Sequence, residues 1–208
     1  MFDANYSAFV VAAGALVISP GASMAVVTDM AIRRGRFAAL MTVAGINIAN
    51  SSLALSSMLG LSAVLHHWPW LLRVISAGGA VYLAYLGVRA LLAPGGSNRA
   101  GSMDSSRAVQ GRSPSPILRG VITNLLNPSV VLFYMLLLPG FIAPGDPFFR
   151  RFLLLAGTHV SMSIAWLSTY SAAVGTLSVH ITRPRVRRTM EVVTGAVLLF
   201  LGVKLVFF

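Results

Sequence analysis

Long runs of apolar residues, separated by short polar or basic segments, recur along the whole chain. A helix needs about 20 predominantly apolar residues to cross the hydrocarbon core of a bilayer. A helix also satisfies its own backbone hydrogen bonds, as a segment in lipid must. The pattern therefore predicts an all-α integral membrane protein with six transmembrane helices, at residues 6–28, 37–65, 71–93, 117–143, 152–174 and 190–208.

The second half of the sequence resembles the first. Chance similarity between apolar segments is the alternative, but an ordered series of matches favours duplication. Three matches occur in the same order and at nearly constant separation: 79–89 with 195–204, Gly45 with Gly157, and Pro20 with Pro128.

Three spans in each copy, an odd number, would insert the second copy upside down relative to the first. Inverted repeats of this kind are typical of secondary transporters, whose substrate sites lie near the bilayer midplane at the repeat interface. We therefore expect two inverted three-helix repeats, residues 1–93 and 117–208. Between them, residues 94–116 are rich in Gly, Ser, Pro and Arg and predict a flexible cytoplasmic linker.

The low share of charged residues excludes a soluble protein, and the positions of the arginines explain the positive net charge. Charged residues make up 10% of the chain, against roughly 25% in soluble domains. Basic inter-span segments stay in the cytoplasm, so we expect both termini outside, contact with anionic lipid headgroups, and no nucleic-acid partner. Most arginines lie in alternate inter-span segments: Arg33, Arg34, Arg36, Arg99, Arg107, Arg112, Arg183, Arg185, Arg187 and Arg188.

The residue inventory argues against metal and thiol chemistry. The chain has no cysteine, which excludes thiolate metal sites and thiol catalysis. His66 and His67 lie beside Trp68 and Trp70 and suit an interfacial aromatic belt better than a metal site, because no third ligand is in view. Asp3 stands where a signal peptide carries basic residues. We expect no cleaved signal, no cofactor, no metal and no catalytic residue.

Helix breakers mark a candidate substrate site. Proline removes a helical hydrogen bond and clashes with the preceding turn. In the first span, Pro20 is followed at once by a second helix breaker, Gly21, in the sequence Ser19-Pro20-Gly21. In the matching fourth span, Asn127-Pro128 interrupts the apolar run close to Asn124. Broken helices in equivalent spans are the best sequence indication of a transporter site. An ordinary proline kink is the alternative.

These residues also carry a family resemblance over nearly the whole chain. The sequence resembles the LysE/RhtB superfamily of bacterial amino-acid exporters, and this implies a six-span inner-membrane exporter driven by the proton-motive force. Two positions depart from the usual family pattern: Ala22 follows Pro20-Gly21 in place of a second proline, and Ser129 replaces a common lysine. The resemblance rests on Ser19-Pro20-Gly21, Gly35-Arg36, Gly45, Tyr82-Leu83, Leu86-Gly87 and Asn124-Leu125-Leu126-Asn127-Pro128.

Polar residues inside the predicted spans suggest how protons are coupled. Asn47 and Asn50 interrupt the second span, and the match of Gly45 with Gly157 places His159 opposite Asn47, facing a shared centre. Histidine titrates near physiological pH, and an ionisable residue inside a membrane is a functional candidate. We expect His159 to carry the coupling proton. A neutral histidine that bridges helices is the alternative.

The few acidic residues bear on the substrate. We expect Asp29 to be a solvated cap or to form an ion pair near Arg33, with a substrate contact as the alternative. We expect Glu191 to start the sixth helix, where an acid complements the helix dipole. No acid is then left deep in a span to balance a cationic substrate. The sequence thus predicts a neutral amino acid, whose carboxylate meets a broken helix end near Gly21 or Pro128.

Other classes of protein remain open. A channel would need a polar stripe or charged ring along its pore, whereas the polar residues here are few and central. A non-transport membrane scaffold is a further alternative to a transporter. An intramembrane enzyme would need an acid to orient His159. Gly45, Gly78 and Gly79 suit close helix packing, either within one chain or across a homodimer.

Overall fold

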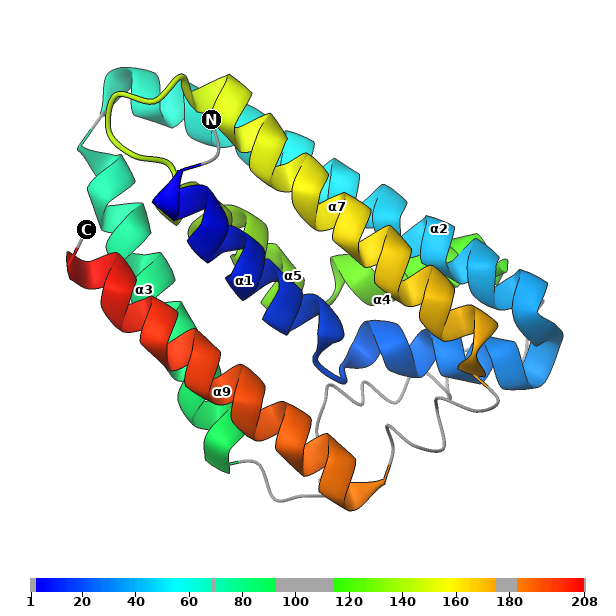
Figure 1. The fold of residues 1–208 in the computed structure, drawn as a ribbon. Coiled ribbons are helices and arrows are strands. Elements are labelled where there is room, and N and C mark those ends of the chain that lie inside the picture. Colours follow the sequence, from blue (N-terminus) through cyan, green and yellow to red (C-terminus); the bar gives the residue numbers. More distant parts are fainter. Residues whose placement is uncertain (1–2, 69, 93–113, 175–182, 208) are drawn as a thin grey trace.

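The structure, a computed structural model, describes residues 3–68, 70–92, 114–174 and 183–207. Within these residues every regular element is a helix, in agreement with the predicted all-α class. Nearly all of the predicted linker lies outside them. The first half forms α1 (Ala4–Ile18), α2 (Ala22–His67) and α3 (Leu71–Leu92) (Figure 1).

The second half is divided into more elements. The predicted fourth span is made of four short helices, one of them the π-helix η2, and it bends by 62° between α4 and α5. The helices of this half are α4 (Pro116–Leu125), α5 (Pro128–Leu132), η2 (Phe133–Leu137), α6 (Leu138–Gly140), α7 (Phe148–Ala172) and α9 (Pro184–Phe207).

Helix α2 consists of two arms that meet at Gly35, where φ is 82° and ψ is 176°. Glycine adopts a positive φ without a Cβ clash, and the chain reverses direction here (Figure 1). The first arm completes the predicted first span, and the second arm is the predicted second span. The basic segment expected between these spans is therefore a one-residue turn, with Arg34 and Arg36 on either side.

The helices pack in pairs around α1. Helix α2 packs against α4 and α7, α3 lies beside α9, and α1 lies between α7 and α9. The interior of this bundle is apolar: Phe9 of α1, Leu137 of η2 and Leu155 of α7 are fully buried. This core holds η2 against α7, so that Tyr134 of η2 and His159 of α7 come into contact.

Glycines bring α2 and α4 into backbone contact. A Cβ atom on Gly45 would lie 2.1 Å from the carbonyl oxygen of Ile117, and one on Gly120 would lie 2.3 Å from that of Thr42. Small residues are the usual means of close helix approach in membranes. Packing of Gly45 within one chain is thus confirmed.

Two helical segments of the described chain are long and apolar enough to cross a membrane: Ala22–Leu61 and Phe148–Ala172. The bent pair Pro116–Leu125 and Pro128–Gly140 counts as a third if it forms one span, and Ala4–Ile18 and Arg73–Val88 are shorter apolar helices. All six predicted segments are helical where they are described. Their number as spans and their inverted relation remain predictions.

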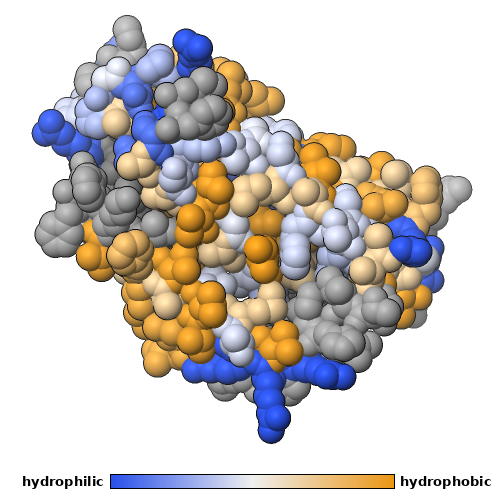
Figure 2. Space-filling model, in the orientation of Figure 1, coloured by the Kyte–Doolittle hydropathy of each residue, from blue (hydrophilic) through white to orange (hydrophobic). Residues whose placement is uncertain are grey.

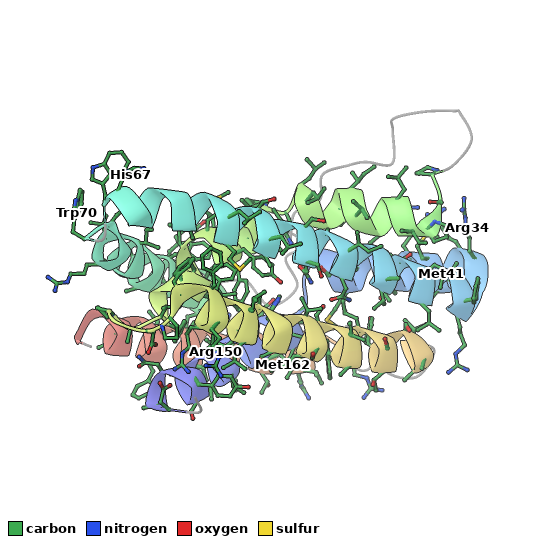
Figure 3. The ribbon with its side chains drawn as sticks, turned by 90° about the horizontal axis from the view of Figure 1, so that it is seen from above. Arg34, Met41, His67, Trp70, Arg150 and Met162 are labelled. Carbon is green, nitrogen blue, oxygen red and sulfur yellow. The ribbon has the colours of Figure 1, made fainter. Side chains whose placement is uncertain are left out.

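The two ends of the bundle differ in character. Arg34 lies at one end, and His67 and Trp70 lie at the other (Figure 3). The start of α1 and the end of α9 lie on the side where α2 ends and α3 begins (Figure 1). Hydrophobic side chains cover much of the face over α3 and α9, with strongly hydrophilic ones at the margins (Figure 2). Val81 of α3 and Phe200 of α9 are each 69% exposed, which suits contact with lipid.

Candidate functional site

The first predicted break is present. Helix α1 ends at Ile18, Ser19 turns to an extended ψ of 130°, and α2 begins only at Ala22. Pro20 and Gly21 lie between the two helices. The carbonyl of Gly21 accepts the first hydrogen bond of α2, from the Ala25 amide at 3.0 Å. The helix therefore stops and restarts here, as the sequence predicts.

The second predicted break is also present, and its side chains explain it. Helix α4 ends at Leu125, and Asn127 has an extended ψ of 106°. The Oδ1 atom of Asn127 accepts from the Ser129 amide at 3.1 Å, so this side chain caps α5. Pro128 occupies the first helical position, where a missing N–H costs nothing. Asn127 thus shapes the break.

Five polar side chains meet beside the two breaks, and we call them the amide cluster: Ser23, Asn47, Asn50, Asn124 and Ser163. Asn124 is 1% exposed, and its Nδ2 donates to Asn50 Oδ1 at 2.8 Å and to the Ile46 carbonyl at 3.3 Å. Ser23 Oγ donates to Asn124 Oδ1 at 3.4 Å. The cluster therefore joins both arms of α2 to α4.

Asn50 links the rest of the amide cluster. Its Nδ2 lies 3.3 Å from Asn47 Oδ1 and 3.5 Å from Ser163 Oγ on α7. Asn47 Nδ2 donates back to the Val43 carbonyl at 2.9 Å. Amides and hydroxyls both donate and accept, so these groups can bind a carboxylate, an ammonium or a hydroxyl group when their mutual bonds open.

A second buried group surrounds His159, and we call it the histidine cluster: Ser57, Phe133, Tyr134 and His159. His159 Nδ1 lies 2.8 Å from Tyr134 Oη. The Phe133 ring lies over the imidazole, with ring centroids 4.2 Å apart. Ser57 Oγ donates to the Tyr134 carbonyl at 2.7 Å. The imidazole therefore has a polar partner and lies between aromatic rings.

The structure brings Asn47 and His159 to neighbouring sites rather than to one contact. Asn47 bonds within the amide cluster, while His159 bonds to Tyr134. The two clusters follow each other along the α2–α7 interface, because Ser163 and His159 are one turn apart on α7, roughly 6 Å. Sequence reasoning missed Tyr134 and Ser57, and it noted Asn50 without giving it a role, although the spacing from Asn47 to Asn50 places both on one helix face.

Asp29 forms an ion pair, one of the two structural roles that the sequence leaves open for it. Its carboxylate contacts Arg33 one turn later on α2. It also lies 2.9 Å from a guanidinium nitrogen of Arg119 on α4, a partner that the sequence gave no reason to expect. The pair is partly exposed, so it fastens α2 to α4 at the surface.

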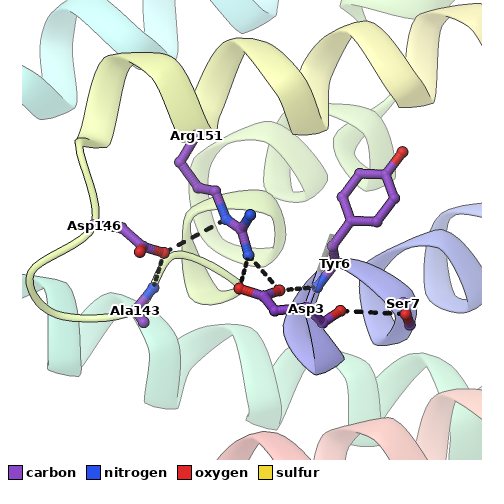
Figure 4. A network of polar contacts seen from close by, with 6 residues as sticks. All are labelled: Asp3, Tyr6, Ser7, Ala143, Asp146 and Arg151. Atoms are coloured by element: carbon purple, nitrogen blue, oxygen red, sulfur yellow. Dashed lines mark hydrogen bonds and ion pairs between the residues drawn. The ribbon is translucent and has the colours of Figure 1, made fainter. Parts of the chain in front are cut away.

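Arg151 is a buried cation that the sequence analysis did not single out. Its side chain is 7% exposed, and it pairs with Asp3 and, at 3.4 Å, with Asp146 (Figure 4). The Tyr6 amide, which donates to the Asp3 carboxylate, and the Arg151 guanidinium hold the pKa of Asp3 below its ordinary value. These contacts tie the start of α1 and the loop after α6 to α7.

Glu191 corrects one prediction. Helix α9 begins at Pro184, so Glu191 lies about two turns inside it, beyond the reach of the helix dipole. Arginine favours helix, so the basic segment extends the predicted sixth span at its start. Glu191 is also buried, with 9% exposure. The expectation that it starts the helix is therefore wrong.

Glu191 lies apart from the amide cluster. Helix α9 packs against α3 and α1, whereas the cluster lies between α2, α4 and α7. In the part of the chain that the structure describes, no three His, Asp or Glu side chains are grouped so that they could hold a metal ion.

Interrupted helices beside buried polar clusters, inside an apolar helical bundle, are typical of many membrane transporters. The chain belongs to the LysE type translocator family, whose family model matches residues 14–207. The family resemblance seen in the motifs is thus confirmed.

Several curated proteins are similar to this chain. An uncharacterized membrane protein of Bacillus subtilis, YrhP, is 26% identical over 95% of this chain and 96% of its own length. The threonine efflux protein of Escherichia coli K12 is 30% identical, but the match covers 57% of each chain. The homoserine/homoserine lactone efflux protein of Salmonella typhimurium is 23% identical over 94% of this chain and 92% of its own length. No solved structure matches the chain.

Proposed function

We propose that this protein exports small neutral amino acids, or close derivatives, from the cytoplasm in exchange for protons. The observation that carries the proposal is the meeting of two broken helices at one buried amide cluster. Relatives named for threonine and for homoserine efflux support an amino-acid substrate. A bacterial inner membrane, with both termini outside, completes the proposal.

The proposed substrate site combines the two breaks with the amide cluster. The helix that restarts at Ala22 directs its free amides toward the break, and such a helix start attracts a carboxylate. Ser23 of the cluster lies in the first turn of that helix and bonds to Asn124. The residues proposed to bind substrate are Ser19, Pro20, Gly21, Asn47, Asn124, Asn127 and Pro128.

The chemistry of the amide cluster favours a neutral substrate. Its five side chains are uncharged, and a cationic side chain buried among them would lack a carboxylate partner at a large cost in free energy. Glu191, a buried acid, belongs to α9 and lies away from the cluster. A hydroxyl-bearing zwitterion would instead exchange its hydrogen bonds with those of Asn50 and Asn124.

His159 is the proposed carrier of the coupling proton. It is buried on α7, one turn from Ser163 of the amide cluster. Protonation there would place a positive charge close to the bound substrate, so proton binding and substrate binding would influence each other. This connects the proton gradient to the direction of export.

Efflux from proteoliposomes tests the proposal. Vesicles loaded with threonine, homoserine or lysine are compared with and without an imposed pH gradient. We expect saturable efflux of the neutral amino acids that the gradient accelerates, and slow lysine efflux. Lysine efflux at the rate of the best neutral substrate would contradict the neutral class. Unsaturable flux that ignores the gradient would favour a channel, and no flux from folded protein would favour a scaffold.

His159→Gln tests the coupling step in the same vesicles. Glutamine keeps hydrogen-bonding capacity but cannot take up a proton near neutral pH, so we expect exchange without a gradient to continue and acceleration by the gradient to vanish. His67→Gln is the matched control, because His67 is exposed at the end of α2. Gradient-driven efflux that is unchanged in His159→Gln would refute this role.

A further inference from the structure

We propose that Tyr134 is a positioning residue that keeps His159 hydrogen-bonded both before and after it takes up a proton. This inference rests on the proposed proton coupling and adds a second residue to it. It is carried by the contact between the Tyr134 hydroxyl and the His159 imidazole, and by the π-helix that produces this contact.

The π-helix η2 determines where Tyr134 points. A π-turn holds one residue more than the α-helical turn it replaces, and such turns concentrate at functional sites. Here the turn presents Phe133 and Tyr134, both buried, to the same imidazole. Ser57 Oγ donates to the Tyr134 carbonyl at 2.7 Å. The hydrogen bond from α2 therefore anchors the backbone of the turn.

The two rings contact His159 in different ways. The Tyr134 hydroxyl meets Nδ1 at 2.8 Å, with the tyrosine ring at 86° to the imidazole. The Phe133 ring lies over the imidazole at 4.2 Å, with an interplanar angle of 33°. The face of an aromatic ring attracts a cation. Phe133 thus favours the imidazolium, while Tyr134 fixes the ring through a hydrogen bond.

A hydroxyl group suits both states of the imidazole. It donates to Nδ1 when this nitrogen carries a lone pair, and it accepts when Nδ1 carries a proton. Proton uptake adds one N–H bond and one positive charge to the ring, and the hydroxyl only rotates. A carboxylate or an ammonium at this place would favour one state strongly. Tyr134 therefore lets His159 change its charge without losing its partner.

Among the described residues around His159, Tyr134 is the titratable side chain in contact with the imidazole. From α1, Tyr6 bonds to Thr158, the next residue, at 3.1 Å. From α2, Asn50 bonds to Ser163 of α7 and Ser57 bonds to the Tyr134 carbonyl, and both side chains are uncharged. Helix α6 consists of Leu138, Pro139 and Gly140, none of which is charged. Arg151, the nearest buried charge on α7 itself, lies eight residues earlier, roughly 12 Å along the helix.

Tyr134→Phe removes the hydroxyl and keeps the ring. We expect amino-acid exchange without a gradient to stay within about threefold of the unmodified protein, and the pH profile of gradient-driven efflux to shift by about one unit toward acid. The shift follows because a hydrogen bond to a charged imidazolium is stronger than one to the neutral ring. Tyr85→Phe is the matched control, because Tyr85 lies on α3 outside the histidine cluster and is 56% exposed. Its pH profile should stay where it is.

Ring ¹⁵N NMR of His159, assigned by its loss in His159→Gln, gives a second readout that does not depend on transport. In the unmodified protein, Nδ1 should show a hydrogen-bonded shift at both ends of the titration. A free Nδ1 in either state, or an identical titration in Tyr134→Phe, would overturn the inference. Failure of the proposed function would show separately, as absent amino-acid flux from folded protein.

Discussion

At the scale of single residues, the side chains of the amide cluster both stabilise the fold and belong to the proposed substrate site. Asn124 is buried at the end of α4, and in the described residues the hydrogen-bond partners of its side chain belong to α2. A buried amide that loses its partners costs more free energy than the bonds contribute when they are made. Opening the cluster therefore needs a replacement partner, and a polar substrate supplies one.

Asn124→Leu should weaken both the fold and substrate binding. The leucine leaves Asn50 Oδ1 without its donor, so we expect the free energy of unfolding to fall by about 1–3 kcal/mol. Substrate at about 100 times its Kd should stabilise the unmodified protein by roughly 2.7 kcal/mol and the variant much less. Thermal unfolding in detergent with and without threonine measures both effects.

Ser52→Ala is the matched control for Asn124→Leu, because Ser52 is exposed on α2 and, among the described residues, its side chain bonds to the Ile48 carbonyl of its own helix. It should leave stability and substrate response unchanged. If Asn124→Leu kept the full stabilisation by substrate, Asn124 would be structural and would not bind the transported solute.

At the scale of helices, glycines set the distance between elements. Gly45 and Gly157 are matching positions of the sequence repeat, yet they have opposite surroundings. Gly45 touches the α4 backbone, whereas nothing lies within 4 Å of a Cβ atom on Gly157. A repeat in sequence therefore does not repeat the local packing at this position.

Gly45→Ala and Gly157→Ala should consequently have opposite effects on stability. At Gly45 the added methyl meets the Ile117 carbonyl at 2.1 Å, and backbone cannot yield as a flexible side chain can. We expect a loss of about 1–3 kcal/mol from overpacking. At Gly157 alanine should be neutral or stabilising by up to about 1 kcal/mol, because glycine weakens a helix interior. Thermal unfolding of the two variants in one detergent compares them, and equal midpoints would contradict the close α2–α4 contact.

At the scale of the whole molecule, charged contacts mark its two ends. Asp29 and Arg119 join α2 to α4 near the turn at Gly35, and Arg151 joins α7 to the start of α1 and to the loop that holds Asp146. The loop at 143–147 and the N-terminal end thus lie at one end of the bundle. Chemical labelling of a residue in that loop therefore also shows on which side of the membrane the start of α1 lies.

Single cysteines test the orientation in the membrane, and the chain has no native cysteine to interfere. We expect a membrane-impermeant maleimide to label Pro144→Cys in intact cells, and Arg34→Cys only after the membrane is opened, because basic segments stay in the cytoplasm. Pro144 and Arg34 are both exposed. The reverse pattern would place the termini in the cytoplasm.

The sequence by itself determined the helical class, the approximate extent of the apolar helices, and both helix breaks. These follow from local chemistry: apolar runs form helices in lipid, and proline beside glycine or asparagine interrupts them. The Asp29–Arg33 pair was equally local, since residues four apart share a helix face. Motifs such as Ser19-Pro20-Gly21 sufficed to indicate the family.

Only the tertiary structure decided which polar residues meet. Asn50 contacts Ser163 on α7, Tyr134 contacts His159, and Arg151 contacts Asp3. The first and third pairs join residues that are far apart in sequence. The contact of Tyr134 with His159 depends on a π-turn that no local sequence pattern predicted. The long-range pairs depend on how helices cross, and backbone contact at Gly45 and Gly120 fixes the crossing of α2 and α4. Glu191 was misplaced for a related reason: hydrophobicity marks where an apolar run begins, while the helix itself begins earlier, in basic residues that favour helix.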